Sequence, residues 1–593
     1  MIDRVADVLV VGAGGAGLRA ALAAQDQGAE VLLMCKGKLG KGGVTATACS
    51  DRMAFHATLA HTAPGGADAW KHHAEDIYRL GGFVSDADLA EVLAKNAADA
   101  FSYLDSLGVP FAKDEQGMAA QFLTDGSRYP RACFTGPYTA NHIEEALVRK
   151  VRQTRIGLIE DVTAVDLLVN DGRVCGVLAL DESAAPVVVQ SSAVVLATGG
   201  AGEMYSVNVF PPRMTGDGYA MALRAGAQLV NMEFIQIGLS SVKTKLACSG
   251  SMMRAIPRFV NDAGEEILGR YIADADPEQL ADIVFRKGAS WPVSLEHDTH
   301  AVDVAVFKEE MIAGSPVSLD YSRNPQGLDA DKLGRDLMRR YAEIGAELMN
   351  EPGETPLQRI LGINKQAVEW LKERGVDIPG GDAVEIAPAI QHFQGGVKIR
   401  ERGDTAVPGL FAAGEAAGGQ HGANRPGGNA LLDGQVFGKI AGESAAAAPK
   451  DAGNVDKVAE DAVRALAKRW AKGLDASSTR ETVRALMSRY TSIMRTKEGL
   501  EHAWAKLEEV SAQGISGPPQ EAVEAENMLL VAKSVIKGAL LRDESRGPHL
   551  RFRSEDDRAP LPRQEEKWSR YIVISAHDGD IVAETREPVR PTW

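Results

Sequence analysis

Apolar and polar positions fall into short blocks at the start of the chain, and these blocks predict a βαβ unit. Ala6 to Val11 is an apolar run broken only by Asp7, which is typical of a strand buried on both faces. After the glycine-rich turn Gly12 to Gly17, the Ala- and Leu-rich stretch LRAALAAQDQG predicts a helix. The apolar segment Ala29 to Lys36 then predicts the second strand. Strand, turn, helix and strand in this order indicate a doubly wound α/β sheet.

The pattern of strands and glycine-rich turns continues along the chain and is then interrupted. Two short strands are expected around an Asn-Asp-Gly turn in IGLIEDVTAVDLLVNDGRVCGVLALD, and a further strand is expected in AVVLATGGAGEMY. From about 235 to 370 the chain becomes charged and helical, as in DADPEQLADIVFRK and DKLGRDLMRRYAEIGAEL. The strand-and-glycine pattern resumes at VEIAPAIQHFQGGVKI and VPGLFAAGEAAGG. We interpret the interruption as an inserted domain, followed from about 450 by a helical region and a charged, irregular tail.

Composition and charge exclude several classes of protein. At 593 residues the chain is too long for one core, so roughly two to four domains are expected. The 81 acidic and 65 basic residues give a net charge of -16, which argues against general binding to nucleic acid or to a membrane surface. We find no signal peptide and no apolar run of about 18 residues that could span a membrane. The cysteines are scattered, so no disulfide framework, iron–sulfur site or zinc site is expected within the chain, and a reducing cytoplasm is the default location.

The turn after the first strand reads GxGxxG, with Gly12, Gly14 and Gly17 at the fingerprint positions. Glycines there allow a tight turn and a close approach of the backbone to a pyrophosphate at a helix N-terminus. The alternative is a generic strand-to-helix turn. One feature departs from the usual fingerprint, because the second strand ends in Met34-Cys35-Lys36 where an acidic residue usually binds the ribose.

Four separated motifs occur along the chain: the GxGxxG turn, ATGG, TGDG at Thr215 to Gly218, and GLFAAGEAAGGQHGANRPGGNALLDGQVFGKIAG. Together they resemble the flavoprotein family of succinate dehydrogenase, fumarate reductase and L-aspartate oxidase. The segment ALLRDESRGPHLR also resembles the ESRG-x-H segment of that family. The resemblance implies a Rossmann-like α/β FAD-binding domain interrupted by an α+β capping domain and followed by a C-terminal helical domain. The boundaries we expect are 1–234 and 371–447 for the FAD-binding domain, 235–370 for the capping domain, 448–560 for the helical domain and 561–593 for an irregular tail.

The same resemblance indicates which residues contact the cofactor. The expected FAD-binding residues are Gly12, Gly14, Gly15, Gly17, Lys36, Gly42, Gly43, Thr198, Gly199, Asp217, Glu415, Asn429, Ala430 and Leu431. Glu415 ends a strand and can accept hydrogen bonds from sugar hydroxyls, although a solvated loop acid is the alternative. The glycines before Asn429 lead into a helix whose N-terminus can stabilise negative charge on the reduced flavin ring; simple helix packing is the alternative.

Gly43 stands where the family sometimes carries the histidine that binds the flavin covalently. The segment KGGVTATACS corresponds to SHTVAAQGG of such members, and the next histidine is His56. We therefore predict non-covalent FAD.

On the substrate side, the resemblance indicates Arg425, His392 and Arg286. Arg425 lies in HGANR, where the family's arginine binds a substrate carboxylate; a guanidinium suits this bidentate contact. His392 lies in AIQHFQGG and resembles a second carboxylate contact, and Arg286 in DIVFRKG resembles the family's proton donor, with Lys287 as the fallback. The alternatives are a salt bridge to the capping domain for Arg425, a buried structural histidine for His392 and a solvated helix charge for Arg286. We expect His421 to shape the loop.

The chain departs from the family at the second carboxylate site. Gly238 and Leu239 replace the His and Pro of FxQFHPT, and Ala255 stands where the proton relay has a glutamate. Half of the dicarboxylate clamp is therefore missing or rebuilt.

We predict an FAD-dependent oxidoreductase that transfers hydride between flavin N5 and the Cα–Cβ bond of a small organic acid. Two alternatives stay open. One is oxidation of an amino acid as in L-aspartate oxidase. The other is a flavin subunit that exchanges electrons with an iron–sulfur partner, because the chain has no cluster ligands of its own; such a partner could hold the protein at a membrane.

Overall fold

The computed structural model describes residues 2–48, 53–124, 126–290, 292–329, 355–450, 455–577 and 580–593. The strands are β1 (Arg4–Val11), β2 (Val31–Met34), β3 (Phe55–His56), β4 (Ala132–Cys133), β5 (Gly157–Ile159), β6 (Thr163–Asn170), β7 (Arg173–Leu180), β8 (Pro186–Leu196), β9 (Leu229–Val230), β10 (Ile235–Ser241), β11 (Arg258–Asn261), β12 (Val317–Asp320), β13 (Val384–Phe393), β14 (Gly396–Lys398), β15 (Leu410–Ala412), β16 (Ala417–Gly418), β17 (Leu474–Asp475), β18 (Arg495–Thr496), β19 (Ile515–Ser516), β20 (Arg551–Phe552), β21 (Tyr571–His577) and β22 (Asp580–Arg586).

The α-helices follow the same numbering along the chain. They are α1 (Gly15–Asp26), α2 (Val44–Thr47), α3 (Ala69–Leu80), α4 (Ala87–Lys95), α5 (Ala97–Ser106), α6 (Thr139–Val151), α7 (Asp217–Arg224), α8 (Gly250–Arg254), α9 (Leu268–Tyr271), α10 (Pro277–Lys287), α11 (His300–Phe307), α13 (Pro356–Glu373), α14 (Asn429–Ala446), α15 (Val455–Arg469), α16 (Ala476–Tyr490), α17 (Lys497–Gln513), α18 (Pro519–Leu541) and α19 (Glu565–Trp568).

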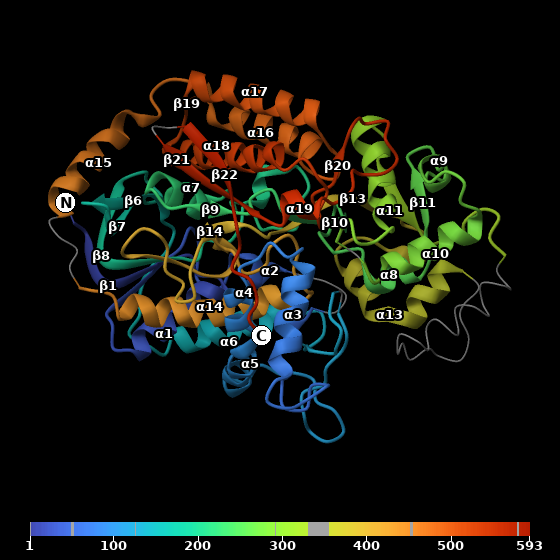
Figure 1. Cartoon of the computed structure of the whole chain (residues 1–593), viewed down its shortest axis with the longest axis horizontal. Helices are drawn as coiled ribbons and strands as arrows, with labels where there is room; N and C mark the ends of the chain where they lie inside the picture. Colours follow the sequence, from blue (N-terminus) through green and yellow to red (C-terminus); the bar gives the residue numbers. More distant parts are fainter. Residues whose placement is uncertain are drawn as a thin grey trace.

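The largest sheet contains the predicted βαβ unit. Its strand order is β5-β2-β1-β8-β7-β6, with β15 also paired to β8. β1 is parallel to β2 on one side and to β8 on the other, so Val8 lies opposite both Val31 and Ala193. α1 and α14 pack side by side below this sheet (Figure 1). Because β15 returns to the sheet next to β8, segments from both ends of the FAD-binding region build one domain.

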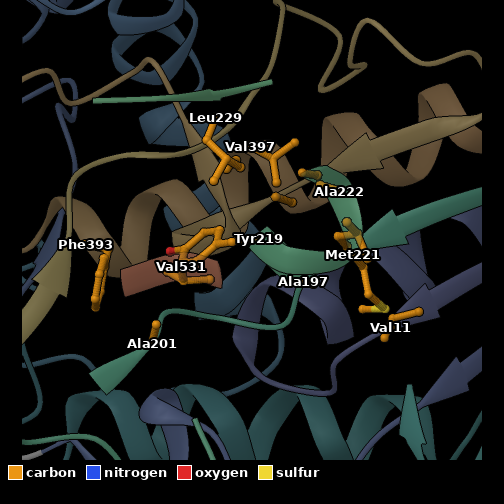
Figure 2. Close-up of a cluster of buried hydrophobic side chains, with 14 of the residues drawn as sticks. Val11, Ala197, Ala201, Tyr219, Met221, Ala222, Leu229, Phe393, Val397 and Val531 are labelled. Carbon is orange, nitrogen blue, oxygen red and sulfur yellow. The ribbon is translucent and has the colours of Figure 1, made fainter. Parts of the chain in front are cut away.

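A buried apolar cluster contains side chains of this sheet and of the five-stranded sheet that includes β9 and β14 (Figure 2). Tyr219 and Met221 of α7 lie within the cluster, with Met221 near Val11 of β1. On the other side Leu229 of β9 is paired with Val397 of β14. Val11, Ala197 and Ala201, which stand at the glycine-rich turns that follow β1 and β8, belong to this cluster.

The capping domain lies to one side of the FAD-binding domain (Figure 1). Its sheet has the order β10-β13-β12-β11 and is antiparallel throughout. The predicted boundary at 371 differs from the structure, because β13 pairs with β10 and β12 and therefore keeps the chain in the capping sheet as far as Phe393. The predicted helix in DADPEQLADIVFRK is α10, whereas the one in DKLGRDLMRRYAEIGAEL lies outside the described residues.

The C-terminal region begins with the helices α15 to α18, as predicted, but its last part is not irregular. β21 and β22 form an antiparallel hairpin, and β21 pairs with β9 in the sheet of order β16-β14-β9-β21-β22. The prediction of an irregular tail was wrong because Tyr571 to Ile574 is a run of buried, mostly β-branched residues that pairs on both sides, with β9 and with β22.

Candidate functional site

A cavity with an empty volume of about 1880 Å³, including the part open to solvent, lies at the carboxyl ends of β1, β8 and β15. This is the edge of a parallel sheet at which α/β proteins bind ligands. The predicted cofactor residues that line it are Gly12, Gly14, Gly15, Lys36, Gly42, Gly43, Thr198, Gly199, Asp217, Glu415, Ala430 and Leu431. The structure therefore brings together residues from widely separated motifs. Gly17 and Asn429 lie outside the lining.

The glycine turn fits the pyrophosphate of a dinucleotide. Gly12 has φ 107° and a Cβ there would lie 2.2 Å from the carbonyl oxygen of Ala197, so the turn requires glycine. A Cβ at Gly17 would lie 1.8 Å from the carbonyl oxygen of Gly12, which explains why Gly17 packs α1 against β1 and does not face the cavity. A Cβ at Gly14 would meet nothing within 4 Å, so this backbone is open to a ligand.

Two further features fit bound FAD. The hydroxyl Oγ1 of Thr198 is buried and has no hydrogen-bond partner among the described residues, although Thr198 lines the cavity. α1 and α14 both start at the cavity, and the N-cap residue of neither helix provides a side-chain cap, although the N–H of Gly15 donates to Oγ1 of Thr45 at 3.3 Å. The remaining N–H groups of the first turns and the partial positive charge of each helix end favour anionic groups. The residues present thus fit the cofactor that the sequence predicts.

Asn429, the first residue of α14, is held from behind the cavity. Its Oδ1 lies 2.8 Å from Nδ1 of His56 and 3.1 Å from Nε2 of His73, and all three residues are buried. Burial lowers the pKa of both histidines, that of His73 to about 3, so both rings are neutral. We conclude that Asn429 anchors the start of α14, while Ala430 and Leu431 face the cavity.

Lys36 is neutralised by acids from two distant segments. Its Nζ lies 2.7 Å from Oδ2 of Asp217 and 2.9 Å from Oε1 of Glu524 in α18. Burial alone would raise the pKa of Asp217, but Lys36 and hydrogen bonds from Asn527 and Thr215 keep it below its usual range. Sequence reasoning missed Glu524, since it lies in a helix far along the chain. Glu524 places a carboxylate close to the end of β2, where the usual fingerprint has an acidic residue and this chain has Lys36.

Glu415 lies in the lining next to the arginine of the HGANR motif. Its Oε1 accepts a hydrogen bond of 2.8 Å from the backbone N–H of Phe393. Burial raises the pKa of Glu415 to about 8, although Phe393 N–H and Arg425 act in the opposite direction. At neutral pH this carboxyl is mostly protonated, so it can donate as well as accept a hydrogen bond.

Arg425 and His392 lie in the same cavity, as predicted for a carboxylate site. Arg425 is 8% exposed; its Nη1 donates to the carbonyl of Pro426 at 3.3 Å, while its Nε has no partner among the described residues. Burial lowers the pKa of Arg425 to about 10, so it stays charged at neutral pH. Burial and the charge of Arg425 lower the pKa of His392 well below its usual value, and the ring is therefore neutral. His421 packs edge-on against His392 with ring centroids 6.0 Å apart.

The structure also places Gln391 in the lining, which the sequence did not single out. Adjacent residues of a regular strand point to opposite faces of the sheet. If His392 faces the cavity, Gln391 is therefore expected to face away from it. A shift in the pairing of β10 with β13 explains why both line it, because Gln236 pairs with His392 whereas Ile237 pairs with Ile390.

The structure does not bring Arg286 to the cavity. Arg286 lies at the end of α10 with its side chain 42% exposed, and Asp282 and Asp298 bind its guanidinium. These hydrogen bonds raise its pKa above the usual value. The fallback, Lys287, is fully buried and lies 2.5 Å from Oδ2 of Asp303. Neither side chain is placed to contact a ligand in this conformation of the capping domain.

The departures at the second carboxylate site are visible in the structure. Gly238 and Leu239 are buried in β10 opposite Ala389 and Pro388, and they add no polar side-chain atom. Ala255 is also fully buried. From the segment after β10, Ala247 lines the cavity.

No helix in the described ranges is long and apolar enough to cross a membrane. Within the same ranges, no group of three or more His, Cys, Asp or Glu side chains is arranged to hold a metal ion.

Comparisons with known proteins agree with this site. Residues 7–431 match the family described as FAD binding domain, and residues 480–592 match that described as fumarate reductase flavoprotein C-term. The chain is 32% identical over 585 residues to an uncharacterized FAD-dependent oxidoreductase of Methanocaldococcus jannaschii, covering 96% of each protein. It is 31% identical over 591 residues to one of the subunits of the fumarate reductase (CoM/CoB) of Methanothermobacter marburgensis, covering 96% of this chain and 97% of that one.

A solved structure shows the same architecture along the whole chain. The Sdh1 complex of Mycobacterium smegmatis in its apo form matches with a TM-score of 0.79 and 28% identity, covering 100% of this chain and 96% of the other. Family, relatives and fold thus agree with the glycine cradle and the cavity described above. The chain belongs to the FAD-binding flavoprotein family of fumarate reductase, succinate dehydrogenase and L-aspartate oxidase, and it is an FAD-dependent oxidoreductase.

Proposed function

We propose that the protein transfers hydride between the N5 atom of FAD and the Cα–Cβ bond of a small carboxylate. The observation that supports this most directly is that Arg425 and His392 share one cavity with the glycine cradle. Bound FAD supplies the hydride donor or acceptor, and the chain's own side chains supply the binding and proton-holding groups.

Arg425 binds the substrate carboxylate in this proposal. Its guanidinium is charged, buried and has an Nε without a partner in the described part of the chain, so a carboxylate can satisfy it with a charge-assisted hydrogen bond. His392 is neutral and adds a hydrogen bond without a second charge. Together they fix the carboxylate and thereby orient the neighbouring carbon–carbon bond.

The proton donor in the proposal is Arg286, in a conformation of the capping domain in which it has left Asp298. An arginine with a raised pKa releases a proton poorly. Its role therefore depends on losing the two acids that now hold it. Glu415 also lines the cavity and is mostly protonated at neutral pH, so it is a second group there that already holds a proton.

A second candidate is oxidation of an amino acid, since Arg425 suits its carboxylate equally well and a relative that is 29% identical over 592 residues is named L-aspartate oxidase. We further propose that the protein exchanges electrons with an iron–sulfur partner, in keeping with relatives that are named as subunits. Copurification of a brown partner chain from the native organism would support this, and a stand-alone yellow enzyme that is reduced by NAD(P)H would contradict it.

The decisive experiment uses the purified holoenzyme under anaerobic conditions. Its flavin is reduced with light, and 2-enoates including fumarate are added while the flavin absorbance is followed. We expect rapid reoxidation by at least one enoate, and none with Arg425→Met. If no enoate reoxidises the flavin but L-aspartate reduces the oxidised enzyme, amino-acid oxidation is the function.

A further inference from the structure

We infer that Gln391 contacts the substrate and that the substrate combines one carboxylate with a neutral hydrogen-bonding group, such as an amide, carbonyl or hydroxyl. This inference rests on the proposed function of the same cavity. It goes beyond that function because it names a residue that selects among substrates. It also names the chemistry of the substrate group that lies away from the carboxylate bound by Arg425.

A β-bulge turns Gln391 toward the cavity. Gln236 of β10 lies opposite His392, and the next residue, Ile237, lies opposite Ile390, so Gln391 is the extra residue of β13. Such a bulge breaks the alternation of side chains and re-aims them, which is a common device next to active sites. Gln391 and His392 consequently both line the cavity.

The amide of Gln391 is left for a ligand. Its side chain is half-buried and makes no hydrogen bond with any residue in the described part of the chain. The amide of Gln394 also lacks a partner among the described residues, but Gln394 is fully buried and does not line the cavity, whereas two other glutamines nearby are bonded. Gln236 donates to Asn424 at 2.7 Å and so shapes the loop that carries the substrate arginine, whereas Gln420 donates to Asp433 at 3.2 Å. A partly buried amide without a hydrogen-bond partner destabilises the protein unless water or a ligand forms the missing hydrogen bonds.

The charges of the cavity fit one carboxylate and not two. Among the cationic side chains in the described lining, Lys36, Lys38 and Arg213 are already paired with acids. Arg425 remains, and the protonated Glu415 leaves its charge largely uncancelled.

A second substrate carboxylate would meet no free cation in that part of the lining. His392 is neutral, so it supplies no second cation. Burying an unpaired carboxylate is strongly unfavourable, whereas an amide or hydroxyl can pair with the carboxamide of Gln391. Gly238 and Leu239 offer no polar side-chain atom as an alternative partner.

The test compares three acids that share a carbon–carbon double bond next to one carboxylate. Fumaramate has a neutral amide at the far end, crotonate has a methyl group, and fumarate has a second carboxylate. Reoxidation of the photoreduced holoenzyme gives kcat/KM for each acid. Because intrinsic reactivities differ, the comparison is between variants for each acid. Binding is measured separately, by titrating the oxidised holoenzyme with the saturated analogue succinamate and following the flavin spectrum.

Gln391→Met keeps the length of the side chain and removes its hydrogen bonds. We expect it to lower kcat/KM for fumaramate and to raise the Kd for succinamate by about threefold to tenfold. Its effect on crotonate should stay within about twofold, because a methyl group makes no hydrogen bond. Gln391→Arg should raise the rate with fumarate relative to fumaramate. The control is Gln326→Met, which changes an exposed glutamine of the capping domain.

Two outcomes overturn the inference. One is an unchanged succinamate Kd in Gln391→Met; the other is an equal loss with all three acids. Failure of every enoate to reoxidise wild-type flavin would instead contradict the proposed function. In that case the succinamate titration still decides whether Gln391 contacts a ligand.

Discussion

Asp298 holds the guanidinium of Arg286 on the capping domain, with its Oδ2 accepting from Nη2 at 2.9 Å. Asp282 accepts from Nε of the same side chain at 2.7 Å. An arginine held by two carboxylates is tied to its own domain, and to reach a substrate it has to exchange these partners. The pair therefore links the position of the capping domain to the proton-donor role proposed for Arg286.

Arg286→Gln tests that role. If Arg286 supplies the proton, we expect kcat to fall by about a hundredfold or more while FAD stays bound. The matched control is Arg270→Gln, which removes another half-exposed arginine of the capping domain that also pairs with two acids, Glu265 and Glu309. Equal activity of the two variants would remove Arg286 from the mechanism. Steady-state turnover with the best enoate is the measurement.

The pair of Lys36 with Asp217 predicts an effect on cofactor affinity. In Lys36→Met, Asp217 keeps its hydrogen bonds but loses its nearest cation, whereas Glu524 stays paired with Arg213. Leaving Asp217 without its cation in this poorly exposed site costs about 2 kcal/mol or more. If the apoprotein avoids this cost because Asp217 becomes solvated there, FAD binding weakens by the same free energy, which is roughly thirtyfold.

The measurement is the Kd of FAD for apoprotein reconstituted after mild removal of the flavin. Lys38→Met is the control, because Lys38 also lies at the cavity but is 61% exposed and pairs with Asp161 at the surface. A loss of affinity in Lys38→Met as large as that in Lys36→Met would show that general charge at the cavity, not the buried pair, is responsible.

The parts of the fold that the sequence predicts well are those set by neighbouring residues. The apolar strand β1, the glycine turn and α1 follow each other directly along the chain. A Cβ at Gly12 or Gly17 would collide with backbone atoms, so the local geometry of the turn requires the glycines that the sequence shows. Arg425 and His392 lie in short motifs and also reach the expected cavity.

Other parts depend on contacts that no local pattern records. Glu524 reaches Lys36 only because α18 packs against the FAD-binding domain. Gln391 enters the cavity through a shift in strand register, and register is decided by the partner strand β10. The hairpin of β21 and β22 is different, because its β-branched residues could have been read as strands; the charged segment before it obscured that signal.

The prediction of non-covalent FAD follows from the side chains near Gly43. Gly43 offers no nucleophile, and Cys35, a thiol in the same lining, donates to the carbonyl of Gly37. Burial raises the pKa of Cys35 to about 11, so it is not a thiolate at neutral pH. We expect acid precipitation to release all of the flavin into the supernatant. Yellow colour that remains in the washed pellet would contradict this.

Glu144 in α6 predicts a dependence of stability on pH that has nothing to do with catalysis. Its side chain is 2% exposed, and neither oxygen has a hydrogen-bond partner among the residues that the structure describes. Burial raises its pKa from 4.5 to about 8. Between these two values the folded protein keeps a proton that the unfolded chain has released, so the free energy of unfolding falls as the pH rises.

Glu144→Gln removes this titration and keeps the shape of the side chain. We expect the variant to differ from wild type by less than about 1 kcal/mol at pH 5 and to be more stable by about 4 kcal/mol at pH 8, since wild type loses about 1.4 kcal/mol for each pH unit between the two pKa values. The apparent Tm of the holoenzyme at pH 5, 6.5 and 8 is the measurement. The neighbouring Glu145 is exposed, so Glu145→Gln should leave the pH dependence as it is in wild type. If Glu144→Gln and wild type lose stability in parallel from pH 5 to 8, the carboxyl of Glu144 is ionised in the folded protein and has a partner in solution.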